Sequence, residues 1–488
     1  MEANTAALLD FDQALQAFRS SVVPLLEVGE AQTWDGCTFK AREGQIVWAA
    51  LVLAGQCTAL LLHHLACSAE AHATAAQRTQ GRRRDGSQGH GQRTVTVVTI
   101  GNVAVRLQVP YVVTRRRSKR AKRPGQRGGA RDANFYPFLA WLGIEEGLTP
   151  LVWTTVAKYG LLQASFEAAR DTLHAWGIIL STKRIDRLTY RFGQIGLNLR
   201  QRQLDQLKQG TLPEGQTLAG QRVVLSVDGG RARLRHSKRG RRKANRRHGY
   251  RGEWKEPKVL TIYVVDPDGH KVSTQEIPLT NDGTFGEVDQ FMQVLEMHLV
   301  RLGIRHAAQV LFLADGAPWM WERIPALLHR LGCPDDRLIE LLDFYHATEH
   351  LSAFAEAAFS NPQAARTWFK KACAALKRGH AATLLHQMQA LWSHAKSKQK
   401  PGLTKELDYF QTRRSRLQYA RVAALKLPIG SGAVESLLRQ VVNLRIKGAG
   451  KFWLGEHAEI MLHARCQWAA GAWDHFCDSI LTANLCPI

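Results

Sequence analysis

Residues 221–230 read QRVVLSVDGG, an apolar run that ends in an aspartate followed by two glycines. Residues 309–316 repeat this pattern as QVLFLADG, and residues 337–344 read RLIELLDF. Short apolar runs bounded by turn residues are typical of strands buried in a sheet. The first two runs therefore predict buried strands that carry Asp228 and Asp315 at their carboxyl ends.

The segments around these runs predict the rest of an α/β domain. Residues 258–279 read KVLTIYVVDPDGHKVSTQEIPL, in which Pro-Asp-Gly predicts a hairpin turn. Apolar periodicity predicts helices from Phe285 and over Trp319–Leu331. Three neighbouring strands followed by alternating strands and helices fit an RNase H-like core, a mixed sheet flanked by helices. In that sheet the first and fourth strands are neighbours, which would bring the two aspartates together.

A third acidic residue lies far downstream, in LPIGSGAVES at residues 427–436. The glycines allow close approach of the backbone, and apolar spacing predicts a helix that starts near Gly432 and carries Glu435 in its first turn. Residues 361–427 are expected to form a helical insertion before this helix. A local alternative exists for each acid, because Asp-Gly is a common turn and a first-turn glutamate can simply favour the helix dipole.

Converging carboxylates would suit phosphodiester chemistry. Transesterification at a phosphodiester uses two divalent ions, of which one activates the attacking oxygen and the other stabilises the leaving oxygen. Magnesium prefers carboxylate oxygens, and strand ends hold such groups rigidly. We therefore expect Asp228, Asp315 and Glu435 to be metal ligands and catalytic residues, with Mg²⁺ or Mn²⁺ as the cofactor.

The order DGG, DGA-P-W, D-x-x-H and GSG-x-VES along the chain resembles the DDE transposases of bacterial insertion sequences, of the ISKra and ISLre-like type. The resemblance is strong over Gln221–Trp468, weaker over the region before it, and negligible over the first 75 residues. It implies that Asp228, Asp315 and Glu435 form the DDE metal-binding triad of an enzyme that cuts and rejoins DNA. The alternatives are a catalytically inactive DNA-binding protein derived from a transposase, and an RNase H-like nuclease without strand transfer.

The D-x-x-H element begins at Asp343 and ends at His346, and His350 follows one helical turn later. Residues four apart share a helix face, so both histidines can point toward the site. We expect His346 to be catalytic by contacting the scissile phosphate, with Asp343 and His350 in supporting positions. Simple packing is one alternative, and a zinc pair is another, although no cysteine or acid at a suitable spacing completes it.

The charge of the chain indicates a polyanionic partner. Sixty-six Lys and Arg residues outnumber 42 Asp and Glu residues, a formal net charge of +24. Neutralising phosphates releases counterions, which favours double-stranded DNA, although ribosomal and membrane-surface proteins share such charge. Dense basic runs occupy residues 81–84, 115–131 and 231–251. The third run begins just after Asp228, and a solvated loop is its alternative reading. Its expected DNA-binding residues are Arg231, Arg233, Arg235, Lys238, Arg239, Arg241 and Arg242.

Tryptophans near these segments, Trp254, Trp319 and Trp321, could stack on unpaired bases, although tryptophans buried in a core are more frequent. The sequence SFEAARDTLHAWG, followed by IILSTKRIDRLTYRFG, resembles a helix-turn-helix over residues 165–193. In that reading Gly177 ends the first helix, and Lys183, Arg184 and Arg187 of the second contact DNA. The alternative is an ordinary αα-hairpin within a bundle.

The remaining segments complete the expected organisation. Residues 93–113 alternate across a Gly-Asn turn and predict a β-hairpin. The eight cysteines show no metal-ligand spacing. The apolar stretch Ile46–Cys67 contains Gln56 and two histidines, so a buried helix is expected there rather than a membrane span. We thus expect a cytoplasmic protein without a membrane partner, and a homodimer or higher oligomer on terminal inverted repeats and target DNA. The expected regions are 1–75 helical, 76–147 hairpin with basic arm, 148–205 helix-turn-helix-like, 206–360 first part of the core, 361–427 helical insertion and 428–488 C-terminal core helices.

Overall fold

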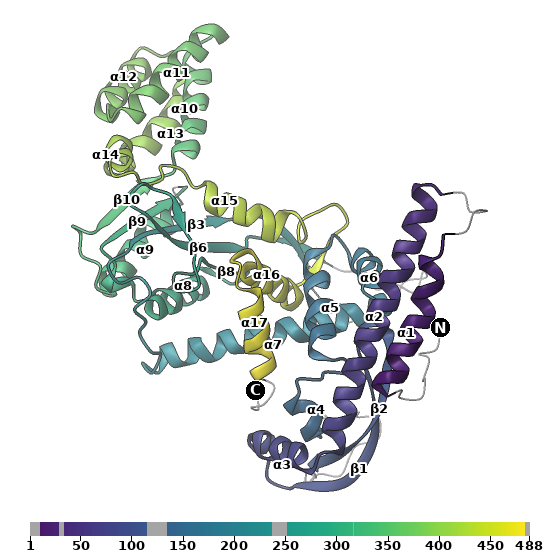
Figure 1. The fold of residues 1–488 in the computed structure, drawn as a ribbon. Helices are drawn as coiled ribbons and strands as arrows, with labels where there is room; N and C mark the ends of the chain where they lie inside the picture. The colour runs from purple at the N-terminus through teal and green to yellow at the C-terminus, as the bar shows by residue number, and fades with distance from the viewer. Residues whose placement is uncertain (1–9, 29–33, 115–133, 237–250, 316, 484–488) are drawn as a thin grey trace. The chain divides into compact units, whose positions relative to one another are not determined.

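The computed structural model describes residues 10–28, 34–114, 134–236, 251–315 and 317–483 (Figure 1). It is a mixed α/β structure with mixed sheets flanked by helices. The chain divides into two compact units, residues 1–199 with 474–488, and residues 200–473.

The first unit begins with a pair of long helices, α1 (Phe11–Leu26) and α2 (Gly36–Cys67). Asp10 and Asp35 each form a capping box at the helix start, which satisfies amide donors that the helix leaves unpaired. The expectation of a buried helix at residues 46–67 is wrong: only Gly55, Ala59, Leu60 and Leu62 of α2 are buried. By length and composition α2 could cross a membrane, and 22% of its most apolar window is buried.

A long β-hairpin follows, as the alternation at residues 93–113 predicts. Strands β1 (Ser87–Val98) and β2 (Ala104–Thr114) pair antiparallel, from Val98 opposite Ala104 to Ser87 opposite Thr114. The connection contains Gly101 and Asn102 at φ 68° and 57°, the left-handed conformation that Gly-Asn turns adopt. A Cβ on Gly101 would lie 2.4 Å from the carbonyl oxygen of Leu51, so the turn packs directly on α2.

Helices make up the remainder of the first unit: α3 (Ala69–Arg78), the 3₁₀ turn η1 (Gln80–Arg82), α4 (Pro137–Trp141), α5 (Pro150–Leu162), α6 (Phe166–His174), the first part of α7 (Thr182–Lys208) and most of α17 (Trp473–Ala483). Trp153 on α5 and Phe192 on α7 are fully buried and meet edge to face at 5.4 Å. A Cβ on Gly160 would lie 2.0 Å from the Thr189 hydroxyl oxygen, so α5 and α7 are in close backbone contact.

The second unit is built on a sheet with the order β10-β9-β3-β6-β7, in which β8 also pairs with β6. Its strands are β3 (Arg222–Gly229), β6 (Lys258–Val265), β7 (Lys271–Val272), β8 (Thr280–Thr284), β9 (Gln309–Ala314) and β10 (Leu338–Leu342). Strands β3, β6 and β8 form an antiparallel meander, whereas β9 and β10 run parallel to β3. The continuous apolar runs of the sequence are thus strands buried on both faces.

Two groups of helices belong to this sheet. Helices α8 (Val288–Leu302) and α9 (Pro318–Arg330) connect the strands, and their apolar residues share one core with β3, β6, β9 and β10. Helices α10 (Phe344–Ala358), α11 (Pro362–Lys377), α12 (Ala381–Ser393), α13 (Lys400–Thr412) and α14 (Tyr419–Ala424) gather into one bundle (Figure 1). The chain then returns through α15 (Gly432–Leu438) and α16 (Gly455–Ala469).

A buried polar network joins α8 and α16 to β8, the last strand of the meander. The carboxylate of Asp282 on β8 is fully buried and accepts hydrogen bonds from Arg200 at 3.0 Å, and from His298 and His463 at 2.9 Å each. Burial by itself would raise the pKa of Asp282, but Arg200 and His463 hold it well below its ordinary value. The carboxylate on β8 is therefore a structural anion that binds side chains from three helices, α7, α8 and α16.

Candidate active site

Three aspartates lie at the carboxyl ends of three adjacent parallel strands. Ala314 of β9 pairs with Val227 of β3 on one side and with Leu342 of β10 on the other. Asp228, Asp315 and Asp343 are the next residues of these strands, and the Asp343 amide donates to the Ala314 carbonyl at 2.8 Å. The strand order thus brings Asp228 and Asp315 together, as the sequence predicts, and adds Asp343 beside them.

Asp228 is largely buried among other acids. Burial raises its pKa to about 7, and the negative charges of Asp315, Glu435 and Asp343 contribute, while the hydrogen bond from the Gly229 amide at 2.6 Å opposes them. Within the described residues, no ion pair joins a cation to Asp228, Asp315 or Glu435. A divalent cation would reduce the repulsion between neighbouring carboxylates that have no basic partner.

Glu435 reaches this region because its helix is fastened to the end of β10. The Ser431 amide donates to one carboxylate oxygen of Asp343, and the Phe344 amide donates to the Ile429 carbonyl at 3.0 Å. A Cβ on Gly430 would lie 2.5 Å from the exposed Tyr345 ring, so a larger residue there would have to displace that ring. The Glu435 side chain is exposed in the first turn of α15 and accepts a hydrogen bond from the Ser431 hydroxyl at 2.8 Å.

A second glycine lets α15 approach the end of β3. A Cβ on Gly230 would lie 2.8 Å from the Leu438 side chain, which follows Glu435 by one helical turn. The helix then continues as a π-helix over Arg439–Asn443. Arg465 of α16 donates to the carbonyls of Val441, at 3.1 Å, and Gln440 within that segment. Burial, and to a lesser extent the charge of Arg445, lower the pKa of Arg465 to about 10.

Asp343 has a supporting position. One oxygen accepts from the His346 amide at 2.6 Å, which caps α10, and the other accepts from Ser431. The carboxylate is 1% exposed, so both oxygens serve to join α10 to the start of α15.

The two histidines of α10 have different surroundings. The His350 ring is hydrogen-bonded through Nδ1 to the Glu406 carboxylate of α13, and it stacks on Tyr409 with centroids 3.5 Å apart. His346 is partly exposed, and its Nδ1 lies 3.3 Å from the Glu349 carboxylate. His350 is therefore held within the protein, whereas His346 is the one whose ring remains accessible to a phosphate.

Tyr409 and Glu406 are parts of the site that the sequence analysis missed. The Tyr409 hydroxyl donates to the Asp315 carbonyl at 3.0 Å, and burial raises the pKa of Tyr409 well above its ordinary value. These residues lie in the segment interpreted only as a helical insertion. Nothing in its sequence shows that α13 packs on α10, so no local pattern could have identified them.

The acids do not form a closed metal site in this structure. Among the residues it describes, no group of three or more His, Cys, Asp or Glu side chains is placed to hold a metal ion. Among the same residues, His346 and His350 belong to no such group either, so the structure does not support the zinc alternative. The donor chemistry of Asp228, Asp315 and Glu435, all carboxylate oxygen, nevertheless suits Mg²⁺ or Mn²⁺.

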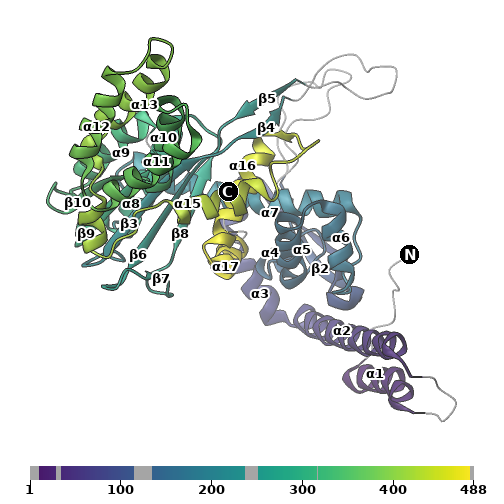
Figure 2. The ribbon, with the colours of Figure 1, turned by 90° about the horizontal axis from the view of Figure 1, so that it is seen from above.

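A small basic sheet extends from the strand that carries Asp228. Strand β4 (Ala232–Arg235) pairs antiparallel with β5 (Gly252–Lys255) and parallel with β11 (Trp453–Leu454), and Figure 2 shows β4 and β5 projecting as a hairpin. The guanidinium groups of Arg231 and Arg233 lie 4.7 and 4.6 Å from the centre of the exposed Trp254 ring.

This sheet joins two basic segments that are distant in sequence. Arg233 also lies 5.6 Å from the ring centre of Phe452, so residues beside β11 contribute to the same surface. Arg231, Arg233 and Arg235 are exposed there. Lys238, Arg239, Arg241 and Arg242 lie outside the described residues. Trp321 is buried and Trp319 partly buried in the core, so of the three tryptophans only Trp254 is an exposed stacking candidate.

The basic residues expected in the helix-turn-helix belong to α7 in the first unit. Gly177 has φ 64°, and the Ser181 hydroxyl accepts from the Arg184 amide at the start of α7, as expected for a turn between helices. Arg187 forms an ion pair with Glu146 at 2.5 Å, and Arg184 donates to the Glu146 carbonyl at 2.9 Å. Lys183 is exposed. These bonds and the close packing of α5 on α7 favour the reading of a helical bundle.

Comparison of the chain with protein-family models, with curated proteins and with solved structures gave no match.

Proposed function

We propose that this protein is a DDE-type DNA transposase of the ISKra and ISLre-like kind, with an RNase H-like catalytic domain in residues 200–473. The strand order supports the fold assignment, because an antiparallel meander followed by two strands parallel to its first strand is the topology that such a domain requires. The carboxyl ends of neighbouring parallel strands are also where α/β proteins commonly place their ligands.

The observation that carries the proposal is the placement of Asp228 and Asp315 at the carboxyl ends of the adjacent parallel strands β3 and β9. Burial and the neighbouring acids, which raise the pKa of Asp228 to about 7, support it. The acids that act on Asp228 come from distant parts of the chain, and a carboxyl group whose pKa is raised in this way is typical of functional sites. Two divalent ions bound there would activate the attacking oxygen and stabilise the leaving oxygen of a phosphodiester.

The chain's own residues would orient this site and hold the substrate. Tyr409 fixes the backbone at Asp315, and Asp343 and Ser431 fix the start of the helix that carries Glu435. His346 would contact the scissile phosphate. Arg231, Arg233 and Arg235 of the basic sheet would bind the DNA backbone beside it, and Trp254 would stack on an unpaired base.

The biological unit would be a homodimer or higher oligomer, because the two ends of the insertion sequence must be paired before joining, and it would act in the cytoplasm.

A strand-transfer reaction tests this function. The protein is incubated with Mn²⁺, a labelled duplex of the terminal inverted repeat and a supercoiled plasmid. Joined product is expected; nicked DNA alone would indicate a nuclease, and a gel shift without reaction would indicate an inactive DNA-binding protein.

A matched pair of variants separates the chemistry from binding. Asp228→Asn should abolish joining and leave the gel shift unchanged, because the carboxamide removes a metal ligand and no DNA contact. Asp336→Asn changes an exposed aspartate of the same unit and should leave both unchanged. Loss of the gel shift in Asp228→Asn alone would mean that Asp228 is structural.

A further inference from the structure

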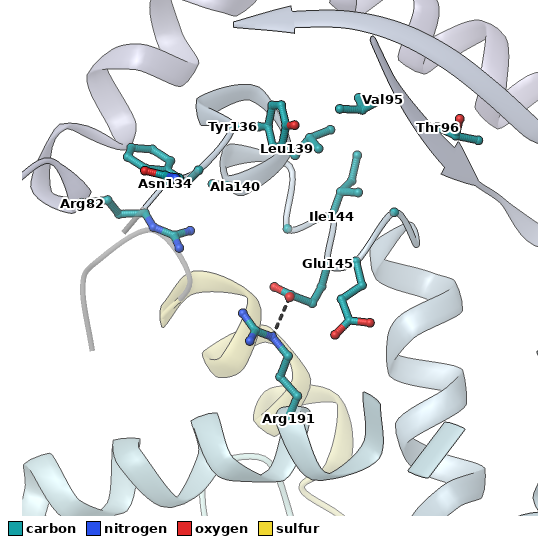
Figure 3. A pocket seen from close by; sticks show the side chains of 14 residues that line it. Arg82, Val95, Thr96, Asn134, Tyr136, Leu139, Ala140, Ile144, Glu145 and Arg191 are labelled. Atoms are coloured by element: carbon teal, nitrogen blue, oxygen red, sulfur yellow. Dashed lines mark ion pairs between the residues drawn. The ribbon is translucent and has the colours of Figure 1, made fainter. Parts of the chain in front are cut away.

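The first unit contains a cavity of about 450 Å³ that the proposed chemistry does not use. It lies among η1, β1, the segment from Asn134 to Gly147 and α7, all within residues 1–199 (Figure 3). Cavities of this size hold small molecules or single nucleotides.

One wall of the cavity is apolar and aromatic. Tyr136, Leu139 and Ile144 line it, together with Val95 of the hairpin (Figure 3). The Tyr136 ring is held by Tyr111, with centroids 4.7 Å apart. A rigid wall of this kind suits the face of a planar ring.

The opposite side of the cavity carries charge. Figure 3 shows the guanidinium groups of Arg82 and Arg191 turned into the same space, with the Glu145 carboxylate paired to Arg191 at 2.5 Å. The carboxylate of Glu146 is bound by Arg187. Two guanidinium groups and two carboxylates therefore line the cavity, and Arg187, which does not line it, adds a third cation beside Glu146.

Arg82 and Glu145 are partly buried, whereas Arg191 is exposed. Burial lowers the pKa of Arg82 and raises that of Glu145, and each feels the charge of the other. A partly buried guanidinium favours an anionic ligand, and the phosphate of a nucleotide can accept two parallel hydrogen bonds from it.

Asn134 adds a neutral polar group. Its side-chain oxygen accepts from the Thr114 amide at 3.0 Å, so the amide nitrogen is the part that can serve a ligand. In the sequence, Asn134 follows the basic run at residues 115–131, which carries many of the chain's cations.

We propose that this cavity binds one nucleotide, with its base against Tyr136 and Leu139 and its phosphate at Arg82 and Arg191. The nucleotide is either free or a single unit turned out of a DNA strand, since both present the same ring and the same phosphate. This binding site goes beyond the proposed DNA joining. It is tested by nucleotide binding, so a negative result would leave the proposed joining reaction at Asp228, Asp315 and Glu435 unaffected.

Photocrosslinking of the full chain with 5-iodo-2′-deoxyuridine 5′-monophosphate tests the site directly. The expected crosslinked peptide contains Tyr136 or Phe135, the aromatic residues that line the cavity. Repeating the reaction with a duplex that carries one unpaired iododeoxyuridine, and with a fully paired duplex, identifies whether the nucleotide comes from solution or from DNA. Absence of a crosslink at these residues with all three probes overturns the proposal.

Calorimetry with deoxyuridine monophosphate provides the second readout. Arg82→Gln should weaken binding by about tenfold or more, since it removes a charged phosphate donor. Arg83→Gln, a change at an exposed neighbour that does not line the cavity, should not. Deoxyuridine without phosphate should bind at least about tenfold more weakly than the nucleotide. Equal affinity for nucleoside and nucleotide would contradict the assignment, as would an equal loss of nucleotide affinity in Arg82→Gln and Arg83→Gln. If Arg82→Gln does not fold, the crosslinking experiment decides.

Discussion

Replacing Asp228 by asparagine should stabilise the metal-free protein, and increasingly so as the pH rises. The Asp228 pKa is raised from the ordinary value of 3.8 to about 7 in the folded protein. A group whose folded pKa is raised contributes its full stability below the unfolded pKa and loses it as the pH rises through the folded pKa. The window of change is therefore about pH 4 to pH 7.

The size of the effect follows from the same two values. At about 1.4 kcal/mol for each tenfold change in proton affinity, the difference between 3.8 and about 7 corresponds to about 4 kcal/mol at its limit. Asparagine has nearly the same shape, and its side-chain oxygen can still accept from the Gly229 amide. The variant should thus gain little at pH 4 and about 4 kcal/mol above pH 7.

Thermal and urea unfolding with a chelator present, at pH 5 and pH 8, measure this gain. The advantage of Asp228→Asn in free energy of unfolding should grow by roughly 3 kcal/mol between the two conditions, or roughly 10 °C in melting temperature. Asp336→Asn, at an exposed position, is the control and should show no such growth. A gain that is the same at both pH values would refute the reasoning, because it would mean that burial and the neighbouring acids do not raise the pKa of Asp228 in the folded protein.

Three further changes test other parts of the structure. Tyr409→Phe removes the hydrogen bond to the Asp315 carbonyl and should cost about 1 kcal/mol in urea unfolding, with a lower joining rate at unchanged DNA affinity. Arg233→Ala should weaken DNA binding and reduce the slope of its salt dependence by about one, measured by fluorescence anisotropy over a salt series; an unchanged slope would place the basic sheet away from DNA. Asp282→Asn should destabilise the second unit by about 3–5 kcal/mol, because it leaves Arg200 and His463 without their buried anion. A small loss in chemical unfolding would show that the network is dispensable.

The apolar runs were sufficient to predict the strands that carry Asp228 and Asp315. The strand order places these two runs side by side in parallel, so their terminal aspartates meet. The hairpin at residues 93–113 was equally predictable, because alternation and a Gly-Asn turn are both local signals. The two glycines around the acids were also informative, since Gly230 and Gly430 each lie where a side chain would collide with a neighbour.

The parts that could not be predicted depend on packing between distant segments. Helix α2 is apolar over Ile46–Cys67, but composition does not tell whether other elements cover it, and only four of its residues are buried. Tyr409 reaches Asp315 only because α13 packs on α10. The pairing of β11 with β4, which brings Phe452 to the arginines of the basic sheet, joins segments more than two hundred residues apart and has no local sequence signal.

The central claim is that Asp228, Asp315 and Glu435 hold divalent cations at one point. Anomalous X-ray diffraction from crystals soaked in Mn²⁺ tests it most directly. We expect manganese peaks between Asp228 and Asp315, with Glu435 turned from Ser431 to complete the ligand set, and no peak there in Asp228→Asn. A wild-type crystal saturated with Mn²⁺ that shows no peak at these carboxylates, or peaks only elsewhere, would contradict the account.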